Sequence, residues 1–283
     1  MSQTKRYLEY FLGFSKSLTL LCFLAACSQG AENSVQDGDS SAIIGGTAAT
    51  STDAVTQSTV ALVMAKSDIL KEQCTGTLIS SNLVITAAHC LEKLRPTNVW
   101  VHFGATLPKP YYLNQLTQVA DFITHAEFSP VYADDFPETE LNDIAVLYLK
   151  TPAPKGFAPV SINLGLPVKI GDNLLVAGYG HISDVNTVRA KGLNYARVPV
   201  SKLWRSLYVL DQTSKSGVCH GDSGGPAYLE TESGLVLSAL TRGAHNKSSN
   251  CHSYTEFTNT KFFKEFILDA AHEMGGELPR FVE

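Results

Sequence analysis

The sequence predicts an all-β protein closed by one C-terminal helix. Short apolar runs of alternating character, separated by glycine, proline, asparagine and aspartate, follow one another from Ile43 onward. Such punctuation is typical of β-barrels and β-sandwiches. Hydrophobic residues form 44% and charged residues 17% of the 283-residue chain, which is enough apolar material for a globular core.

Two of these runs alternate as a strand with one buried face does: Val60, Leu62 and Met64, then Val99, Val101 and Phe103. The run from Ile144 to Leu149 is more continuously apolar, which predicts a strand buried on both faces.

Helical spacing replaces this alternation near the C-terminus. The predicted helix runs from about Thr260 to Glu273, and Gly275 and Gly276 end it. Its apolar residues are Phe262, Phe263, Phe266, Ile267 and Ala270.

The N-terminus reads as a targeting segment. Basic residues precede an apolar run from Leu18 to Ala26, which is too short to span a bilayer and fits a secretory signal over residues 1–26. The run ends in Leu-Ala-Ala-Cys, which resembles a bacterial lipobox, so Cys27 is the candidate for acylation and a membrane anchor. Ser28 after that cysteine is compatible with the outer membrane. The alternative is an ordinary signal with Cys27 as a passenger.

Residues 27–42 then read as a flexible linker, because they are polar, acidic and without a strand or helix period. The net charge of the chain is −5, and no basic cluster offsets it, which argues against a nucleic-acid partner.

One motif carries most of the chemistry: the nine residues CHGDSGGPA from Cys219 to Ala227. A serine hydroxyl is a poor nucleophile until a base activates it and donors stabilise the oxyanion. Glycines on both sides of Ser223 allow a tight turn that aims backbone N–H groups at one point. Taken alone, the motif could equally be a glycine-rich surface turn.

Three further motifs occur in order upstream: IIGG at residues 43–46, TAAHC at 86–90 and NDIAVLYL at 142–149. With the serine motif they resemble the chymotrypsin-like (trypsin-fold) serine peptidases, from Ile43 to about the C-terminus. The resemblance implies two six-stranded antiparallel β-barrels over residues 43–283, joined near residues 151–159, with an active site between them.

The family pattern assigns roles to individual residues. It makes His89 the general base, Asp143 the group that orients it and Ser223 the nucleophile. The backbone N–H groups of Gly221 and Ser223 would form the oxyanion hole. Without the resemblance, His89 could be a hydrogen-bonded core residue and Asp143 a turn residue at the head of a strand.

The resemblance also implies a zymogen. Cleavage before Ile43 would free an α-ammonium that pairs with Asp222. Ala42 precedes Ile43 and no basic residue occurs from 28 to 42, so a trypsin-like activator has nothing to cut. We expect a protease that accepts small residues, which could be this enzyme itself, and the cut would also release the enzyme from its anchor.

For the substrate pocket, the family positions are those of Gly217, Val218, Thr241, Gly243 and His252. Trypsin-like members carry aspartate where this chain has Gly217, so trypsin-like cleavage is disfavoured. Small or apolar side chains are expected first, and acidic ones second because of His252 and Arg242. Thr241 keeps a hydroxyl where the family carries a serine that hydrogen-bonds the aspartate.

Four cysteines follow Cys27, and export favours pairing them, although spacing alone leaves three connectivities. The resemblance implies Cys74 with Cys90 and Cys219 with Cys251. A metal site is the competing hypothesis, but neither CxxC nor HExxH spacing occurs. The loop after Gly104 lacks acidic calcium ligands, so we expect no metal and no cofactor.

The sequence therefore predicts an exported serine endopeptidase acting on protein or peptide substrates, located in a bacterial cell envelope and released after activation. A monomer is expected. The alternative is a catalytically inactive relative that serves as a surface binding module.

Overall fold

The structure is a computed structural model that describes residues 43–66, 69–129, 142–183, 188–214, 216–245 and 250–283. The predicted signal peptide, Cys27 and the linker to Ala42 lie outside the described residues. No described helix is long and apolar enough to cross a membrane.

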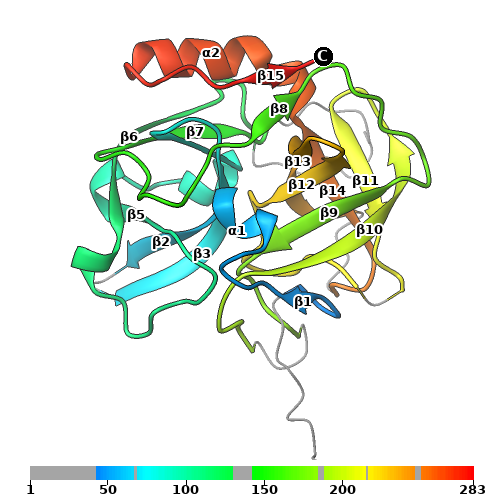
Figure 1. Ribbon diagram of the computed structural model, residues 1–283, viewed down its shortest axis with the longest axis horizontal. Coiled ribbons are helices and arrows are strands. Elements are labelled where there is room, and N and C mark those ends of the chain that lie inside the picture. The colour runs from blue at the N-terminus through cyan, green and yellow to red at the C-terminus, as the bar shows by residue number, and fades with distance from the viewer. Residues whose placement is uncertain (1–42, 67–68, 130–141, 184–187, 215, 246–249) are drawn as a thin grey trace, which may run out of the picture. The chain divides into compact units, whose positions relative to one another are not determined.

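The first barrel closes in the order β2-β3-β4-β7-β6-β5 and is antiparallel throughout (Figure 1). Its strands are β2 (Thr59–Lys66), β3 (Ile69–Leu78), β4 (Leu83–Thr86), β5 (Val99–His102), β6 (Thr117–Thr124) and β7 (Ala145–Leu149). Between them lie the short 3₁₀ turns η1 (Ala88–Leu91), η2 (Pro96–Asn98) and η3 (Leu113–Gln115).

The second barrel is formed by β12-β9-β10-β11-β14-β13 and closes through the β12–β13 pair. Its strands are β9 (Asn173–Gly178), β10 (Asn194–Leu203), β11 (Leu207–Asp211), β12 (Pro226–Thr231), β13 (Gly234–Ala244) and β14 (Tyr254–Asn259). The predicted fold class of two six-stranded antiparallel barrels with a C-terminal helix is therefore confirmed.

Three short strands lie outside the predicted barrels. The strand β8 (Ser161–Asn163) pairs in parallel with β13 and with β15 (Phe281–Val282). At the other side of the second barrel, β1 (Thr47–Ala48) pairs with β10, and the short helix α1 (Ala54–Ser58) leads into β2. Isolated short strands carry little sequence signal, so only the structure shows this extension.

The run Ile144–Leu149 is buried on both faces, as predicted. Alternate residues Ala145, Leu147 and Leu149 face the interior of the first barrel. Ile144 and Val146 belong instead to a second apolar cluster that also holds Tyr228 of β12 and Ile267 of the C-terminal helix. The strand β7 is thus apolar throughout because the second barrel and the helix cover its outer face.

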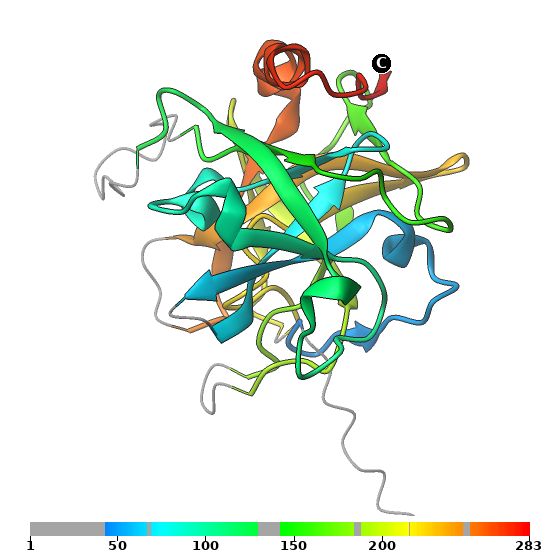
Figure 2. The same cartoon turned by 90° about the vertical axis from the view of Figure 1, so that its left-hand side faces the viewer.

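The C-terminal helix begins later than predicted. Thr260–Phe263 form the 3₁₀ turn η5, and the helix α2 runs over Lys264–Glu273. The Asn259 side chain caps the first turn by accepting a hydrogen bond from the Lys261 N–H at 3.2 Å. Gly275 has φ +66°, a left-handed conformation that ends helices. In Figure 2 the helix lies above the strands of the first barrel.

Buried hydroxyl groups join the two barrels. The Tyr228 hydroxyl lies 2.8 Å from Ser58 Oγ and 2.9 Å from Thr59 Oγ1. The Tyr179 hydroxyl donates to the backbone carbonyl of Gly104 at 2.9 Å. Burial raises the pKa of Tyr228 to about 12 and also raises that of Tyr179, so both stay neutral donors at any physiological pH.

Candidate active site

The first part of the site is a histidine–aspartate pair on the first barrel. In the β4–β7 ladder Thr86 stands opposite Ala145, so the residues that follow β4 and precede β7 meet at one end. His89 Nδ1 lies 2.7 Å from Asp143 Oδ2, and the His89 backbone N–H donates to Oδ1 at 2.9 Å. Only 3% of the Asp143 side chain is exposed. Its carboxylate is held in one geometry because two donors from the same residue, His89, bind its two oxygens.

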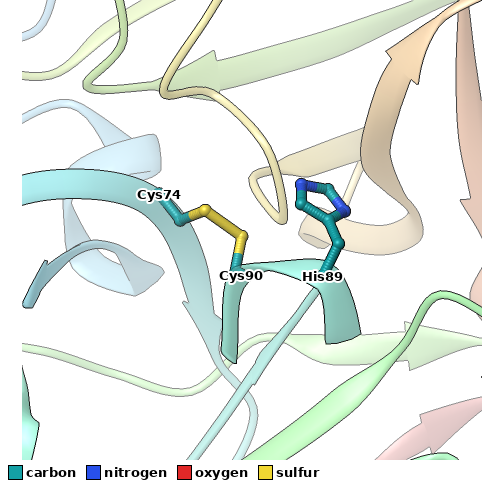
Figure 3. Close-up of side chains that lie close together, drawn as sticks. All are labelled: Cys74, His89 and Cys90. Atoms are coloured by element: carbon teal, nitrogen blue, oxygen red, sulfur yellow. A yellow bond between two sulfur atoms is a disulfide. The ribbon is translucent and has the colours of Figure 1, made fainter. Parts of the chain in front are cut away.

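The His89 ring keeps about a quarter of its surface accessible. It projects from η1 and lies beside the Cys74–Cys90 disulfide (Figure 3). Because Nδ1 faces Asp143, the other ring nitrogen, Nε2, is available to a substrate or nucleophile.

The second part is the turn that carries Ser223, which packs against the His89 segment. The Thr75 N–H donates to the Ser223 carbonyl at 2.9 Å, and Cys90 Sγ lies 3.6 Å from that carbonyl oxygen. Gly224 has φ +75°, and a side chain there would overlap Thr86 Oγ1. Glycine is therefore required next to the serine so that the turn can approach the end of β4.

The oxyanion-hole candidates lie on the same turn. Gly221 has φ +96°, and its Cβ would lie 2.9 Å from the Gly180 Cα. The Asp222 N–H donates to Cys219 O at 3.1 Å and the Gly225 N–H to Asp222 O at 2.9 Å. In the described part of the chain, the N–H groups of Gly221 and Ser223 have no acceptor, so both are available to a ligand oxygen.

Asp222 is fully buried behind this turn. Its carboxylate accepts hydrogen bonds from the backbone N–H groups of Gly180 and Cys219, each at 2.8 Å. The space for the Asp222 side chain exists because residues 178 and 180 are glycines: a Cβ at Gly178 or Gly180 would overlap Asp222. Burial raises the pKa of Asp222 to about 7, although the two amide bonds act in the opposite direction.

Ile43 is close to this region but is not bonded to Asp222. Its side chain is completely buried in the second barrel, in one apolar cluster with Val218. The Gly217 N–H donates to Ile44 O at 2.9 Å, which attaches the segment to the loop before the serine turn. Ile43 has φ +61°, a left-handed conformation that β-branched residues rarely adopt.

A small cavity opens beside Ser223, with a volume of about 70 Å³. It is lined by Val218, Cys219, His220, Ser223, Thr241, Gly243, Ala244, Asn250, Cys251 and Thr255. Of the predicted pocket residues, Val218, Thr241 and Gly243 line it, whereas Gly217 and His252 do not. The His252 backbone N–H donates to Asn250 Oδ1 at 3.1 Å.

Gly217 is covered by Gln212, a residue that sequence reasoning missed. A side chain at Gly217 would overlap the amide of Gln212, so the space beside Gly217 is already filled. No motif marks this glutamine in the sequence.

The expected hydrogen bond from Thr241 to Asp143 is absent. Thr241 Oγ1 is buried and has no hydrogen-bond partner among the residues that the structure describes. Both carboxylate oxygens of Asp143 already accept from His89, and Thr258 Oγ1 instead donates to the Asp143 backbone carbonyl at 3.3 Å. A β-branched threonine has restricted side-chain rotamers, which limits its reach compared with a serine.

Two side-chain groups have metal-like proximity: Cys74, His89 and Cys90, and Cys219, His220 and Cys251. Both pairs of cysteines are disulfides, Cys74–Cys90 and Cys219–Cys251, as the resemblance implied. A disulfide sulfur is not a thiolate, so each group offers one imidazole at most and does not fit a structural metal site.

The two barrels and the histidine–aspartate pair packed against a glycine-flanked serine define the class of serine-type hydrolases. The family model described as Trypsin matches residues 43–267. The chain therefore belongs to the trypsin family.

Individual relatives are distant. The chain is 27% identical to Kallikrein-8 of Mus musculus over 165 residues and to a vitellin-degrading protease of Bombyx mori over 171. Each match covers 54% of this chain and 61% of the relative. Brachyurin of Leptuca pugilator is 28% identical over 210 residues, covering 69% of this chain and 85% of that protein. The chain thus spans less than two thirds of the first two relatives.

Proposed function

We propose that this chain is a serine endopeptidase in which Ser223 attacks the peptide carbonyl, His89 moves the proton and Asp143 orients the imidazole. The observation that carries the proposal is the 2.7 Å contact between His89 Nδ1 and Asp143, directly beside the Ser223 turn. Relatives named as proteases support the same class of reaction.

Each residue has a defined step. With Asp143 accepting the Nδ1 proton, His89 Nε2 takes the Ser223 proton during attack and returns it to the leaving amine. The open N–H groups of Gly221 and Ser223 would donate to the oxyanion, which contributes about 3 kcal/mol per donor in comparable sites. Water then repeats the sequence on the acyl-enzyme.

The specificity is not trypsin-like in this proposal. An arginine or lysine in a narrow pocket requires a buried carboxylate partner. Gly217 has no side chain to supply one, and none of the lining residues is acidic.

The proposed activation is cleavage of the Ala42–Ile43 bond. Asp222 is a buried carboxylate with only neutral amide donors, and its raised pKa reports the cost of that burial. A new α-ammonium at Ile43, whose side chain lies in the same barrel, would offset that cost and order the serine turn. The activator would be a protease that accepts alanine, including this enzyme.

Localisation is proposed from the leader. Export as a bacterial lipoprotein anchored through Cys27 accounts for the lipobox-like sequence, and cleavage before Ile43 would release the catalytic domain to the periplasm or medium. Loss of radiolabelled fatty acid on Cys27→Ala, with export retained, tests the anchor. Equal incorporation in the variant would exclude it.

The first experiment is labelling with a fluorophosphonate before and after the Ala42–Ile43 bond is cut, with Ser223→Ala as the control. Strong labelling of the cut wild-type chain alone supports both the nucleophile and the activation. Absence of labelling in a folded, correctly cut chain would indicate an inactive relative that acts as a binding module.

A further inference from the structure

Gln212 lies directly after β11 and is completely buried. Its Oε1 accepts the Val218 N–H at 2.8 Å, and its Nε2 donates to Val218 O at 3.1 Å and to Cys251 O at 3.0 Å. One donor and two carbonyl acceptors fix the orientation of the amide. The side chain therefore joins two walls of the cavity beside Ser223, those formed by Val218 and Cys251.

Gly217 is the reason this glutamine fits. Its φ is +155°, and an added Cβ would overlap Cγ, Cδ and Oε1 of Gln212. The chain can therefore have a side chain at residue 217 or the glutamine amide in that space, but not both. In this chain the amide of Gln212 occupies the space that a side chain at residue 217 would otherwise fill.

The consequence is a short pocket. The cavity of about 70 Å³ is well below the ~300–1,000 Å³ of sites that take drug-sized ligands. Behind that lining, both Nε2 protons of Gln212 are already used within the protein, so its amide has no free donor for an acidic side chain and no charge for a basic one. A basic group buried there would lose its hydration without gaining a carboxylate partner, because none of the described lining residues is acidic.

We infer that Gln212, which is bonded behind the lining residues Val218 and Cys251, limits the depth of the primary specificity pocket and restricts the residue on the acyl side of the cleaved bond to small uncharged side chains such as alanine and serine. This inference rests on the proposed function. It also matches the chain's own junction, because Ala42 precedes Ile43 and is a residue of that class. The enzyme would then accept its own activation bond.

The test uses the cut enzyme and peptides that differ only at the acyl-side residue: alanine, leucine, phenylalanine, lysine and glutamate. Each kcat/KM is divided by the rate of fluorophosphonate labelling, so that loss of active enzyme is separated from loss of selectivity. The variants are Gln212→Ala and, as a matched control on exposed η3, Gln115→Ala.

We expect the wild type to favour alanine over leucine and phenylalanine at least tenfold, and over lysine and glutamate by more. In Gln212→Ala the leucine-to-alanine ratio should rise about tenfold or more, the range set by a few methylenes in an apolar pocket. Gln115→Ala should leave the ratio unchanged.

A wild type that prefers large or charged residues, or a Gln212→Ala enzyme with an unaltered ratio, would overturn the inference. If Gln212→Ala does not fold, Gln212→Met keeps the bulk without the hydrogen bonds and should retain the preference for alanine. A rise in leucine cleavage in that variant would instead assign selectivity to the hydrogen bonds. Failure to label at all refutes the proposed function rather than the role of Gln212.

Discussion

The two buried aspartates of the site, Asp143 and Asp222, differ in what faces their carboxylates. Asp143 accepts the ring and backbone N–H groups of His89, a side chain that can become cationic. Asp222 is more deeply buried, accepts only two backbone amides, and has its pKa raised to about 7. The first carboxylate has its partner in the uncut chain, whereas the second has no cationic partner among the described residues and would be stabilised by one.

The largest loss of activity is expected from a change at Ser223, the proposed nucleophile. Ser223→Ala should lower kcat by about 10⁶, because no other hydroxyl replaces the nucleophile. Hydrolysis of an alanine-containing peptide by the cut variant measures this. Substantial turnover by the purified variant would show that Ser223 is not the nucleophile.

A change at the first aspartate comes next. Asp143→Asn should lower kcat by about 10⁴, because an amide facing Nδ1 favours the wrong imidazole tautomer while the fold is retained. Asp121→Asn, at an exposed position of β6, is the matched control and should keep full activity. Equal activity of both variants would mean that Asp143 does not orient His89.

Asp222 should make the free energy of unfolding depend on pH. Folding raises the pKa of Asp222 from 3.8 to about 7, so its contribution to stability is fully present below about pH 4 and is lost as pH rises through 7. In the uncut Ser223→Ala chain, the Asp222 contribution to the free energy of unfolding should fall by about 2–3 kcal/mol between pH 5 and pH 8.

Urea unfolding of that chain with and without Asp222→Asn isolates this effect, because the other titrating groups are shared. The difference in unfolding free energy between the two chains should change with pH before the cut. After cleavage before Ile43 the α-ammonium should reduce or reverse that change. A difference that is constant with pH in the uncut chain would contradict the raised pKa.

The smallest effect on stability is expected from removing the Thr241 hydroxyl, which the family pattern predicts to hydrogen-bond Asp143. Thr241→Val removes a buried hydroxyl without a partner and should leave stability unchanged or raise it by up to about 1 kcal/mol. Thr86→Val is the matched control: its hydroxyl donates to Thr75 O at 2.8 Å, so its loss should cost about 1 kcal/mol. Thermal unfolding of both variants tests the ranking, and a larger loss for Thr241→Val would reverse it.

Strand patterning predicted a barrel or a sandwich, and the family resemblance carried by the motifs implied the two six-stranded barrels and the meeting of His89 with Asp143. A strand pair with Thr86 opposite Ala145 places those residues at one end whatever the loops do. The role of Gln212 could not be predicted in this way. Its contacts with Val218 and Cys251 depend on the path of two irregular loops, and glutamine there has no periodic or motif signal. The unpartnered Thr241 hydroxyl is likewise set by local rotamers and by acceptors already occupied.

The left-handed conformation of Ile43 bears on whether the proposed activation cut could be reversed. Such a conformation costs about 1–3 kcal/mol in a β-branched residue. Because φ is defined by the preceding carbonyl carbon, the torsion no longer exists once Ala42 and Ile43 are separated. Resealing the bond would have to restore it, which shifts the equilibrium toward the cut form by a factor of about 5–150. A serine peptidase can also catalyse ligation, so the conformation of Ile43 would disfavour resealing of the proposed activation site.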